Sequence, residues 1–544
     1  MVDIRKSGET DEEQELDIPE EAGVIGYVYD KFEDAENGRF SDEQRWLDAY
    51  KNYRGSESEE YRSSERSKVF VKVTKVKVLA AYGQIIDILF ANKRFPISVT
   101  STPKPEGIAE FAHVKNPQQQ QPDVGPEGFA GDGMELLPGA LEATMPDKPF
   151  LSGLSTKFGE SENLTAGKAP MGEPQIEPAA MAALNMEKVI QDQLVDSNAV
   201  NIFRHALFEA CLLGTGVIKG PFSNTKTVHR WNGVGEERTY APYDKTMPSI
   251  EAVSCWDFYP DPSAVSVEDC EYVIQRHRFN RSQMRDLIGK PFFDKDAIAD
   301  CISRGPNYTE RGYEGSLYSD EANDLRYREN RYEVLEFWGV LDRQMAEAAG
   351  VDIPKSNDDS DSVSVNIWVC NNMILRAMIN PFTPDRLPYQ AVPYEINPYH
   401  LFGVGVAENM EDAQTLMNGH MRMAIDNLAL AGNMVFDIDE TQLVPGQSME
   451  VFPGKIFRRQ SGVTGTAVNG LKFPNTAPEN LQMFQTARQL ADEETGIPSI
   501  THGQTGVTGT GRTAAGLSML LSSAGLSIKT VIKNIDDFML KPMG

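Results

Sequence analysis

The sequence predicts an α+β fold in which helices flank a β-rich middle. Apolar residues recur at helical spacing before residue 100 and again after residue 400. Between residues 221 and 398, several segments have the composition and length of strands. At 544 residues the chain exceeds one typical core, so we expect two or more structural units.

The amino-acid composition restricts the classes of protein to which this chain can belong. The formal net charge is −28, which argues against a general nucleic-acid binder, because such proteins neutralise phosphates with lysine and arginine. The five cysteines form no C-x-x-C motif and are odd in number, so we expect them to be reduced and mostly buried in a cytosolic assembly environment. No apolar run approaches the roughly 20 residues of a membrane span, so no membrane binding is predicted.

The first hundred residues predict two helices after an irregular start. Residues 1–40 are acidic and poorly patterned, and we expect them to be mobile. Ser41 and Gln44 fit a capping box that opens the first helix. A second helix is expected near 68–92, although its start also alternates like a strand, and a strand is expected at 95–100.

A long insertion interrupts this pattern. Residues 103–180 hold 11 of the 32 prolines, and such a stretch cannot bury enough apolar surface to form a core. We expect it to be extended or partly disordered. Residues 181–218 then return to helix, which Gly214 and Gly216 break near its end.

The middle of the chain predicts strands. Asn280–Gly289 is expected to be a short capped helix between them, and residues 355–362 a polar loop. The expected strands are 253–259, 272–279, 332–341 and 363–376.

The last third predicts helix, β-containing excursion, helix, glycine/threonine loop and helix. The excursion carries Pro-Gly turns at 445 and 453, and four basic residues that form either a solvated loop or a docking surface: Lys455, Arg458, Arg459 and Lys472. The five segments are 406–432, 433–477, 478–497, 498–513 and 514–544.

The first of these helices is apolar on more than one side. A wide apolar stripe indicates a helix buried between neighbours, which a packed core or an oligomer can provide. We predict a subunit interface along the residues at three-to-four spacing: Met410, Ala413, Met417, His420, Ala424 and Leu428.

The glycine/threonine loop nearly matches a phosphate-binding loop. Gly506–Thr513 has the spacing of G-x-x-x-x-G-K-[ST], so a nucleotide-hydrolysing motor component is one alternative. Arg512 replaces the lysine, however, and no apolar strand precedes the loop. The seven histidines are scattered. Asp257 and Asp261 could act as a carboxylate pair, but Pro260 and Pro262 indicate a turn there. No catalytic, metal or cofactor site is therefore predicted.

The order of the five C-terminal segments resembles the stem, clip, stem, tunnel loop and tunnel helix of bacteriophage portal proteins. Residues 66–81 and 257–262 strengthen the resemblance. It implies a mixed α/β wing that comprises the helices at 41–102 and the β-rich part at 181–405. It also implies a C-terminal crown beyond the tunnel helix.

What the resemblance implies is a passive DNA channel rather than an enzyme. The ring would contain twelve copies and stand at one vertex of the capsid of a short-tailed phage, after assembly in the host cytoplasm. Its expected partners are the terminase large subunit, tail or adaptor proteins, the major capsid protein and double-stranded DNA bound transiently. Another virion protein, an adaptor or scaffold, is the remaining alternative. The residues expected to line the tunnel are Thr505, Gly506, Thr508, Gly509, Thr510, Gly511, Arg512 and Thr513.

Overall fold

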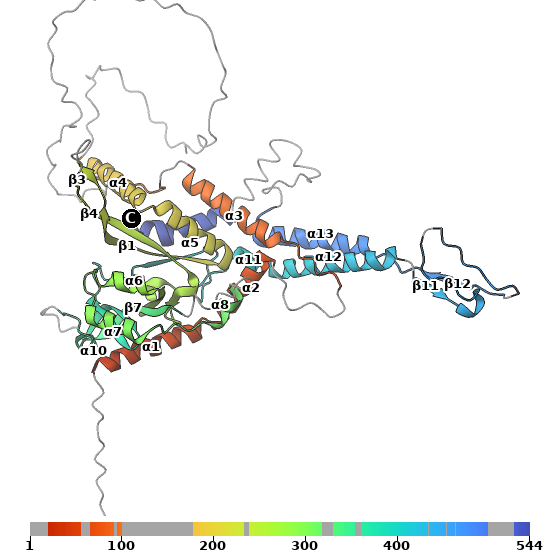
Figure 1. Ribbon diagram of the computed structural model, residues 1–544. Coiled ribbons are helices and arrows are strands. Elements are labelled where there is room, and N and C mark those ends of the chain that lie inside the picture. The colour runs from red at the N-terminus through yellow and green to blue at the C-terminus, as the bar shows by residue number, and fades with distance from the viewer. Residues whose placement is uncertain are drawn as a thin grey trace, which may run out of the picture. The chain divides into compact units, whose positions relative to one another are not determined.

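The computed structural model describes residues 20–55, 66–91, 95–100, 178–232, 239–317, 330–353, 361–433, 435–452, 454–462, 464–498 and 527–543. Contacts divide the chain into two units, residues 98–189 and the remainder. The larger unit combines helices with two main sheets, which confirms the α+β class (Figure 1). No helix among the described residues is long and apolar enough to cross a membrane.

The elements follow in chain order. The helices are α1 (Glu20–Gly38), α2 (Phe40–Arg54), α3 (Val73–Phe90), α4 (Pro178–Asp196), α5 (Ala199–Leu213), α6 (Arg281–Leu287), α7 (Lys295–Arg304), α8 (Gly312–Leu317), α10 (Arg343–Ala348), α11 (Val406–Asn409), α12 (Glu411–Gly432), α13 (Ala477–Thr495) and α15 (Lys541–Met543). The strands are β1 (Thr215–Val228), β2 (Trp231–Asn232), β3 (Thr239–Tyr240), β4 (Tyr243–Val253), β5 (Phe258–Pro260), β6 (Tyr272–Phe279), β7 (Tyr332–Asp342), β8 (Ser362–Cys370), β9 (Met373–Ile379), β10 (Tyr389–Pro393), β11 (Val435–Ile438) and β12 (Val468–Leu471).

A five-stranded antiparallel sheet has the order β5-β6-β7-β8-β9. Successive side chains of a strand point to opposite faces, so each face of this sheet has its own core. Leu335 and Phe337 of β7 pack with α1 and α10, whereas Val334 packs with α6 and α7. The expected strands 272–279 and 332–341 are confirmed, and so is the short capped helix, in which Asn280 and Gln283 form a capping box.

Two predictions fail around this sheet. The strand expected at 363–376 is a hairpin, because Asn371 and Asn372 take positive φ values of 50° and 56° and turn the chain between β8 and β9. The start expected to be mobile contains α1 from Glu20 onwards. Its apolar residues recur at helical spacing and are buried, a pattern that its acidic composition concealed: Val24, Val28, Phe32 and Ala35.

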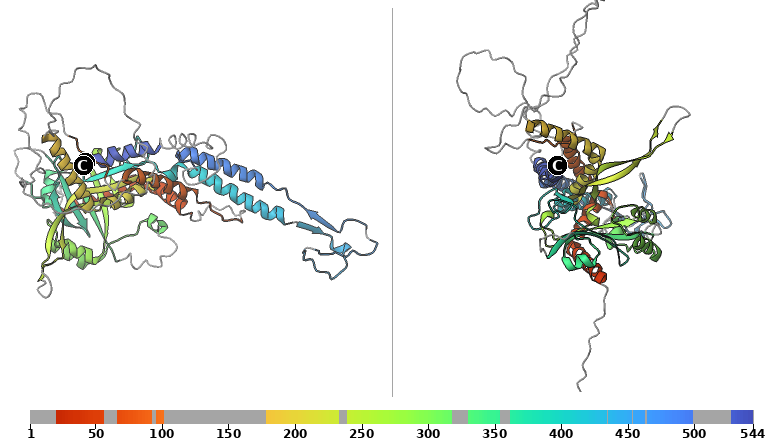
Figure 2. Two further views of the ribbon diagram at one scale, coloured as in Figure 1. Left: turned by 90° about the horizontal axis from the view of Figure 1, so that it is seen from above. Right: turned by 90° about the vertical axis from the view of Figure 1, so that its left-hand side faces the viewer.

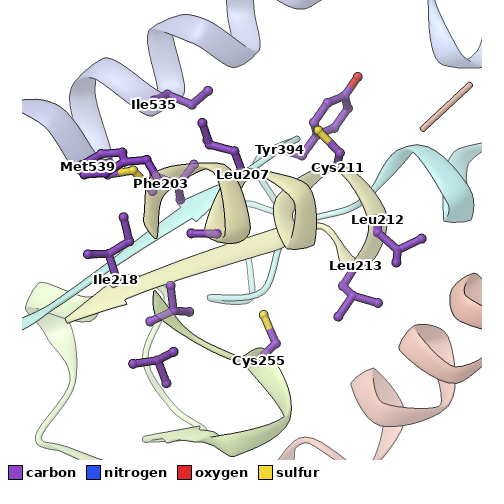
Figure 3. Close-up of a cluster of buried hydrophobic side chains, with 14 of the residues drawn as sticks. Phe203, Leu207, Cys211, Leu212, Leu213, Ile218, Cys255, Tyr394, Ile535 and Met539 are labelled. Atoms are coloured by element: carbon purple, nitrogen blue, oxygen red, sulfur yellow. The ribbon is translucent and has the colours of Figure 1, made fainter. Parts of the chain in front are cut away.

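A three-stranded sheet, β10-β1-β4, supports the largest core. Helix α5 packs on it through Phe203 and Leu207, and Ile535 and Met539 of the C-terminal helix lie in the same cluster (Figure 3). Beyond this core β1 and β4 continue as a ribbon that carries β2 and β3, seen in the right-hand view of Figure 2. The sequence did not indicate this ribbon, because its outer residues are mostly exposed and polar.

Helix boundaries near both sheets also differ from expectation. The helix expected at 181–218 is α4 and α5, separated at Asn198 (φ 55°), and it ends at Gly214, so that residues 215–218 belong to β1. Ser41 lies inside the first turn of α2 and caps nothing. Residues 95–100 form no strand, and Phe95 instead bonds through its backbone to the side chain of Gln191.

A buried charge cluster joins the two sheets. Glu336 on β7 accepts from Lys219 Nζ of β1 at 2.5 Å, and His277 Nε2 of β6 lies 2.7 Å from the same oxygen. Its other oxygen accepts from Trp338 Nε1 at 2.7 Å. Burial alone would raise the pKa of Glu336, but Lys219 and His277 outweigh it, so the pKa lies below its ordinary value.

Glu209 of α5 is expected to make stability depend on pH. Burial raises its pKa to about 7, although Ser254 Oγ and the Cys255 N–H both donate to the carboxylate. A raised pKa means that the folded state binds this proton more tightly, so stability is lost as pH rises from 4.5 through about 7. Denaturant unfolding at pH 5 and pH 8 should show a smaller loss for Glu209→Gln than for the wild type. An equal loss in both proteins would contradict this prediction.

Candidate assembly surfaces

Helices α12 and α13 form an antiparallel hairpin, and they lie side by side in Figure 1 and in the left-hand view of Figure 2. They meet through small and flexible apolar side chains, which let two helices approach closely. The residues of this cluster, together with Val73 at the start of α3, are buried: Met410, Ala413, Met417, Phe484, Ala487 and Ala491. Met410 interrupts the helix expected from 406 and separates α11 from α12.

This packing corrects the predicted subunit interface. Met410, Ala413, Met417 and Ala424 are at most 1% exposed within the single chain, so they are not available to a neighbouring subunit. His420 Nδ1 lies 3.2 Å from Asn480 Oδ1 of α13, which also places it inside the hairpin. Of the six predicted residues, only Leu428, at 50%, is well exposed.

Each helix of the hairpin also carries exposed apolar residues at heptad spacing, outside the buried contact between the two helices. On α12 these are Leu416, Met423 and Leu430, exposed by 47%, 44% and 52%. On α13 they are Met483 and Leu490, exposed by 49% and 41%. We call these sets the α12 stripe and the α13 stripe. Residues seven apart recur along one side of a helix, and such stripes are typical of helices that pack against another helix.

A third side of α12 is covered by an extended segment, residues 66–72. Asp426 accepts from the backbone N–H groups of Arg66 and Ser67 at 3.0 and 2.9 Å. Gln414, which is fully buried, bonds Val71 O and Thr74 N at 2.6 and 3.1 Å. The polar residues of α12 therefore hold this segment, which replaces the first turns of the helix expected at 68–92.

The far end of α13 is fixed at Lys77. This buried lysine of α3 donates to Asp492 and to the Ile497 carbonyl, and burial lowers its pKa against the effect of Asp492. Gly496 ends α13 with φ 63°, and Ser527 Oγ donates to the Gly496 carbonyl at 3.4 Å. Residues 496 and 527 therefore lie together, although 30 residues separate them in the sequence.

The excursion between α12 and α13 contains one two-stranded sheet, β11 with β12, at the end of the hairpin. Gly446 and Gly454 have φ values of 85° and 86°, as the expected turns require. The apolar runs at 449–452 and 456–457 form no strands. Several of the apolar side chains in this excursion are instead exposed: Val435, Val444, Met449, Val451, Phe452, Ile456, Leu471 and Phe473.

The four basic residues of the excursion differ in their surroundings. Lys455 Nζ lies 5.3 and 5.5 Å from the rings of Phe452 and Phe457 and donates to Ser448 O at 2.8 Å. Arg459 donates to the Gly465 carbonyl. Arg458 and Lys472 are exposed, and neither side chain has an ion-pair partner among the described residues. Lys455 and Arg459 thus brace the loop, although Arg459 is itself exposed, and Arg458 and Lys472 face solvent.

The remaining candidates are structural or lie outside the described residues. Asp261 accepts from Ser263 in the expected turn, whereas Asp257 accepts from Arg278 at 2.6 Å in an ion pair that the sequence did not predict. No cluster of metal-ligating side chains occurs in the described part of the chain.

Three predicted segments lie wholly or mostly outside the described residues. They are the tunnel-loop residues 505–513, the insertion at 103–177 and most of the polar loop at 355–362. Of the last expected helix, 527–543 is described and helical, with a π-helical turn at Asp536–Leu540.

The sequence that forms the helical hairpin and the excursion between its helices matches a known protein family. The profile of the family described as the phage SU10 portal protein matches residues 232–544, which is more than half of the chain. The matched region includes the five-stranded sheet, the helical hairpin, the excursion and the C-terminal helix. No curated protein matches the sequence. The chain therefore belongs to the family of phage portal proteins, the head–tail connectors of bacteriophage virions.

Proposed function

We propose that this chain forms a ring at one vertex of the capsid, through which double-stranded DNA is packaged, retained and later ejected. The family match carries this proposal. A ring of identical subunits needs a heterologous contact, in which two different patches of each subunit meet. The α12 stripe and the α13 stripe supply two such patches on one hairpin. We propose that the ring contains twelve copies of the chain and that the phage is short-tailed.

The charge of the hairpin supports a channel that does not retain DNA. Helices α12 and α13 contain seven acidic and two basic residues. An acidic wall repels phosphates over about a Debye length, roughly 8 Å at physiological salt. An acidic wall therefore favours the passage of DNA through the channel over tight binding of the DNA.

The tunnel loop remains a proposal. Residues 505–513 would meet DNA at the narrowest level of the ring, with Arg512 touching phosphates transiently and reading no sequence. The contact between Gly496 and Ser527 supports this proposal, because it brings the two ends of the intervening segment together as a loop requires.

An end-on electron micrograph of the purified protein tests the assembly proposal. We expect closed rings with a central channel and no adenosine triphosphate hydrolysis by the rings. Monomers without rings at micromolar concentration would contradict the ring. Hydrolysis that an Arg512→Ala variant abolishes would instead favour the alternative of a nucleotide-driven motor.

The excursion at 433–477 is the proposed clip, which docks first the terminase large subunit and later a tail adaptor. Exposed apolar side chains beside exposed cations suit partners with apolar and acidic surfaces. The variant Arg458→Glu/Lys472→Glu should leave rings intact and reduce packaged genomes or infectious particles at least tenfold. Plaque yield and native mass measurement check both points.

A matched control keeps the clip prediction specific. Glu450→Lys changes charge at another exposed position of the same excursion but removes no cation, so it should preserve infectivity. Wild-type yield from the double Arg458/Lys472 variant would show that these cations have no major role in docking.

A further inference from the structure

Two buried cysteines meet in the core beneath the five-stranded sheet. Cys301 lies on α7 and Cys370 at the end of β8, 69 residues apart in the sequence. Their Sγ atoms are 3.1 Å apart, and both side chains are fully buried. They meet because α7 packs on the β8–β9 hairpin through a shared apolar cluster.

Polar contacts fix this pair in place. Asn371, in the turn after Cys370, donates to the Gly305 carbonyl at 2.9 Å, and its Nδ2 lies 3.5 Å from Cys301 Sγ. Arg304 donates to the Asn371 carbonyl at 2.9 Å. The end of α7 and the β8–β9 turn are therefore held together from both sides, so the two sulfur atoms are positioned before any reaction.

Cys301 differs chemically from the other four thiols, because its pKa is lowered whereas hydrogen bonding with Cys301 and burial raise the pKa of Cys370. Hydrogen bonding with Cys370 lowers the pKa of Cys301 against the effect of burial, and Asn371 and Arg304 act in the same direction. Burial raises the pKa of Cys211, Cys255 and Cys270. A thiolate is the reactive form of cysteine, so the lowered pKa favours Cys301 over Cys370 as the attacking thiol of the pair.

We propose that Cys301 and Cys370 form an oxidation site, at which peroxide converts the two thiols into an intramolecular disulfide. A disulfide needs its sulfur atoms at about 2.0 Å, so the pair must close by about 1 Å. None of the five cysteines is in a disulfide in this structure.

The reaction balances with one peroxide molecule. The Cys301 thiolate attacks one oxygen of hydrogen peroxide, breaking the O–O bond and releasing hydroxide, which leaves a sulfenic acid on Cys301. Cys370 then loses its proton and its sulfur attacks the Cys301 sulfur, displacing the hydroxyl group as water. Two thiols are oxidised by two electrons, and peroxide is reduced to two molecules of water.

The bond would matter outside the cell. Portal proteins are virion components, and a released virion meets no glutathione or thioredoxin system to keep its thiols reduced. A link between α7 and β8 closes a long loop of the chain, which restricts the unfolded state and stabilises the folded one. The site would thus stabilise this part of the portal after release.

Peptide mapping of the full-length protein tests the proposal. The reduced protein is treated with hydrogen peroxide, then denatured and alkylated with iodoacetamide. We expect a linked peptide pair containing Cys301 and Cys370, with the other three thiols alkylated, and an unfolding midpoint that rises by several degrees and returns with dithiothreitol. Alkylation of both Cys301 and Cys370, or conversion of Cys301 to a sulfinic acid without a link, would overturn the proposal.

Variants separate the pair from general oxidation. Cys370→Ser should abolish the shift in the midpoint and leave a sulfenic acid on Cys301 that dimedone traps. Cys270→Ser, at a partly exposed cysteine whose thiol donates to the Ser266 carbonyl, is the matched control and should keep the full shift. A shift that persists in Cys370→Ser would assign the stabilisation to another reaction.

Discussion

Aspartate at both Leu416 and Met423 is expected to leave this chain folded but to prevent ring formation. Both side chains are exposed in the single chain, at 47% and 44%, so the added charges remain hydrated and cost the monomer little. In the proposed ring the α12 stripe packs against the α13 stripe of a neighbour. There each unpaired buried charge costs several kcal/mol, and the loss recurs at every interface.

Native mass measurement together with circular dichroism checks this prediction. The variant should be monomeric with an unchanged helical signal. Thr415→Asp is the control, because Thr415 is an exposed polar neighbour on α12 outside the stripe, and that variant should still form rings. Intact rings from the Leu416/Met423 variant would mean that the stripe does not lie between subunits.

The corrected interface shows what a helical pattern can and cannot predict. The apolar spacing on α12 indicated correctly that one side of the helix is buried, but the residues that widen this surface, such as Leu416 and Met423, are exposed within the chain, and the second covering segment is held by polar residues. Which side is covered within the chain depends on α13 and on residues 66–72, which are distant in the sequence. The seven-residue spacing of Leu416, Met423 and Leu430 was present in the sequence and is the signal that could have identified the exposed stripe.

Local signals explain the successful predictions in the sheet. The capping box at Asn280 and Gln283, and the apolar character of β6 and β7, lie within short windows of sequence. The β1–β4 ribbon had no such signal, since much of it contacts solvent on both faces. Helix α1 was missed because its acidic composition suggested a mobile segment, while the spacing of Val24, Val28 and Phe32 gave the correct answer.

The clip candidates show a similar limit. Composition identified four basic residues in the excursion, but it could not tell which cations the loop itself uses. Lys455 lies beside two phenylalanine rings and Arg459 bonds a backbone carbonyl, whereas Arg458 and Lys472 are exposed. Docking variants should therefore be built on the second pair.

Replacing Glu336 by glutamine is expected to destabilise the chain by about 3–5 kcal/mol, as is typical when one partner of a buried ion pair is removed. Glu336 and Lys219 are 2% and 6% exposed at their side chains, so the lysine would lose its partner where water cannot replace it. Glutamine also has one acceptor oxygen, whereas Lys219 and Trp338 now donate to different oxygens of the carboxylate.

A double variant distinguishes the lost charge from lost packing. In Lys219→Met/Glu336→Leu both charges are absent, so no buried charge is left unpaired, and this protein should be clearly more stable than Glu336→Gln. Denaturant unfolding at pH 7 measures both differences. If Glu336→Gln loses less than about 1 kcal/mol of stability, which is the range of an exposed ion pair, the cluster contributes little to holding the two sheets together.

The pH dependence of stability gives a second check. The lowered pKa of Glu336 stabilises the fold above the ordinary value of 4.5, and this contribution is lost as pH falls below that value. The stability of the wild type should therefore fall relative to that of the double variant in strong acid, where the carboxylate becomes protonated and the Lys219 charge is left without a counterion.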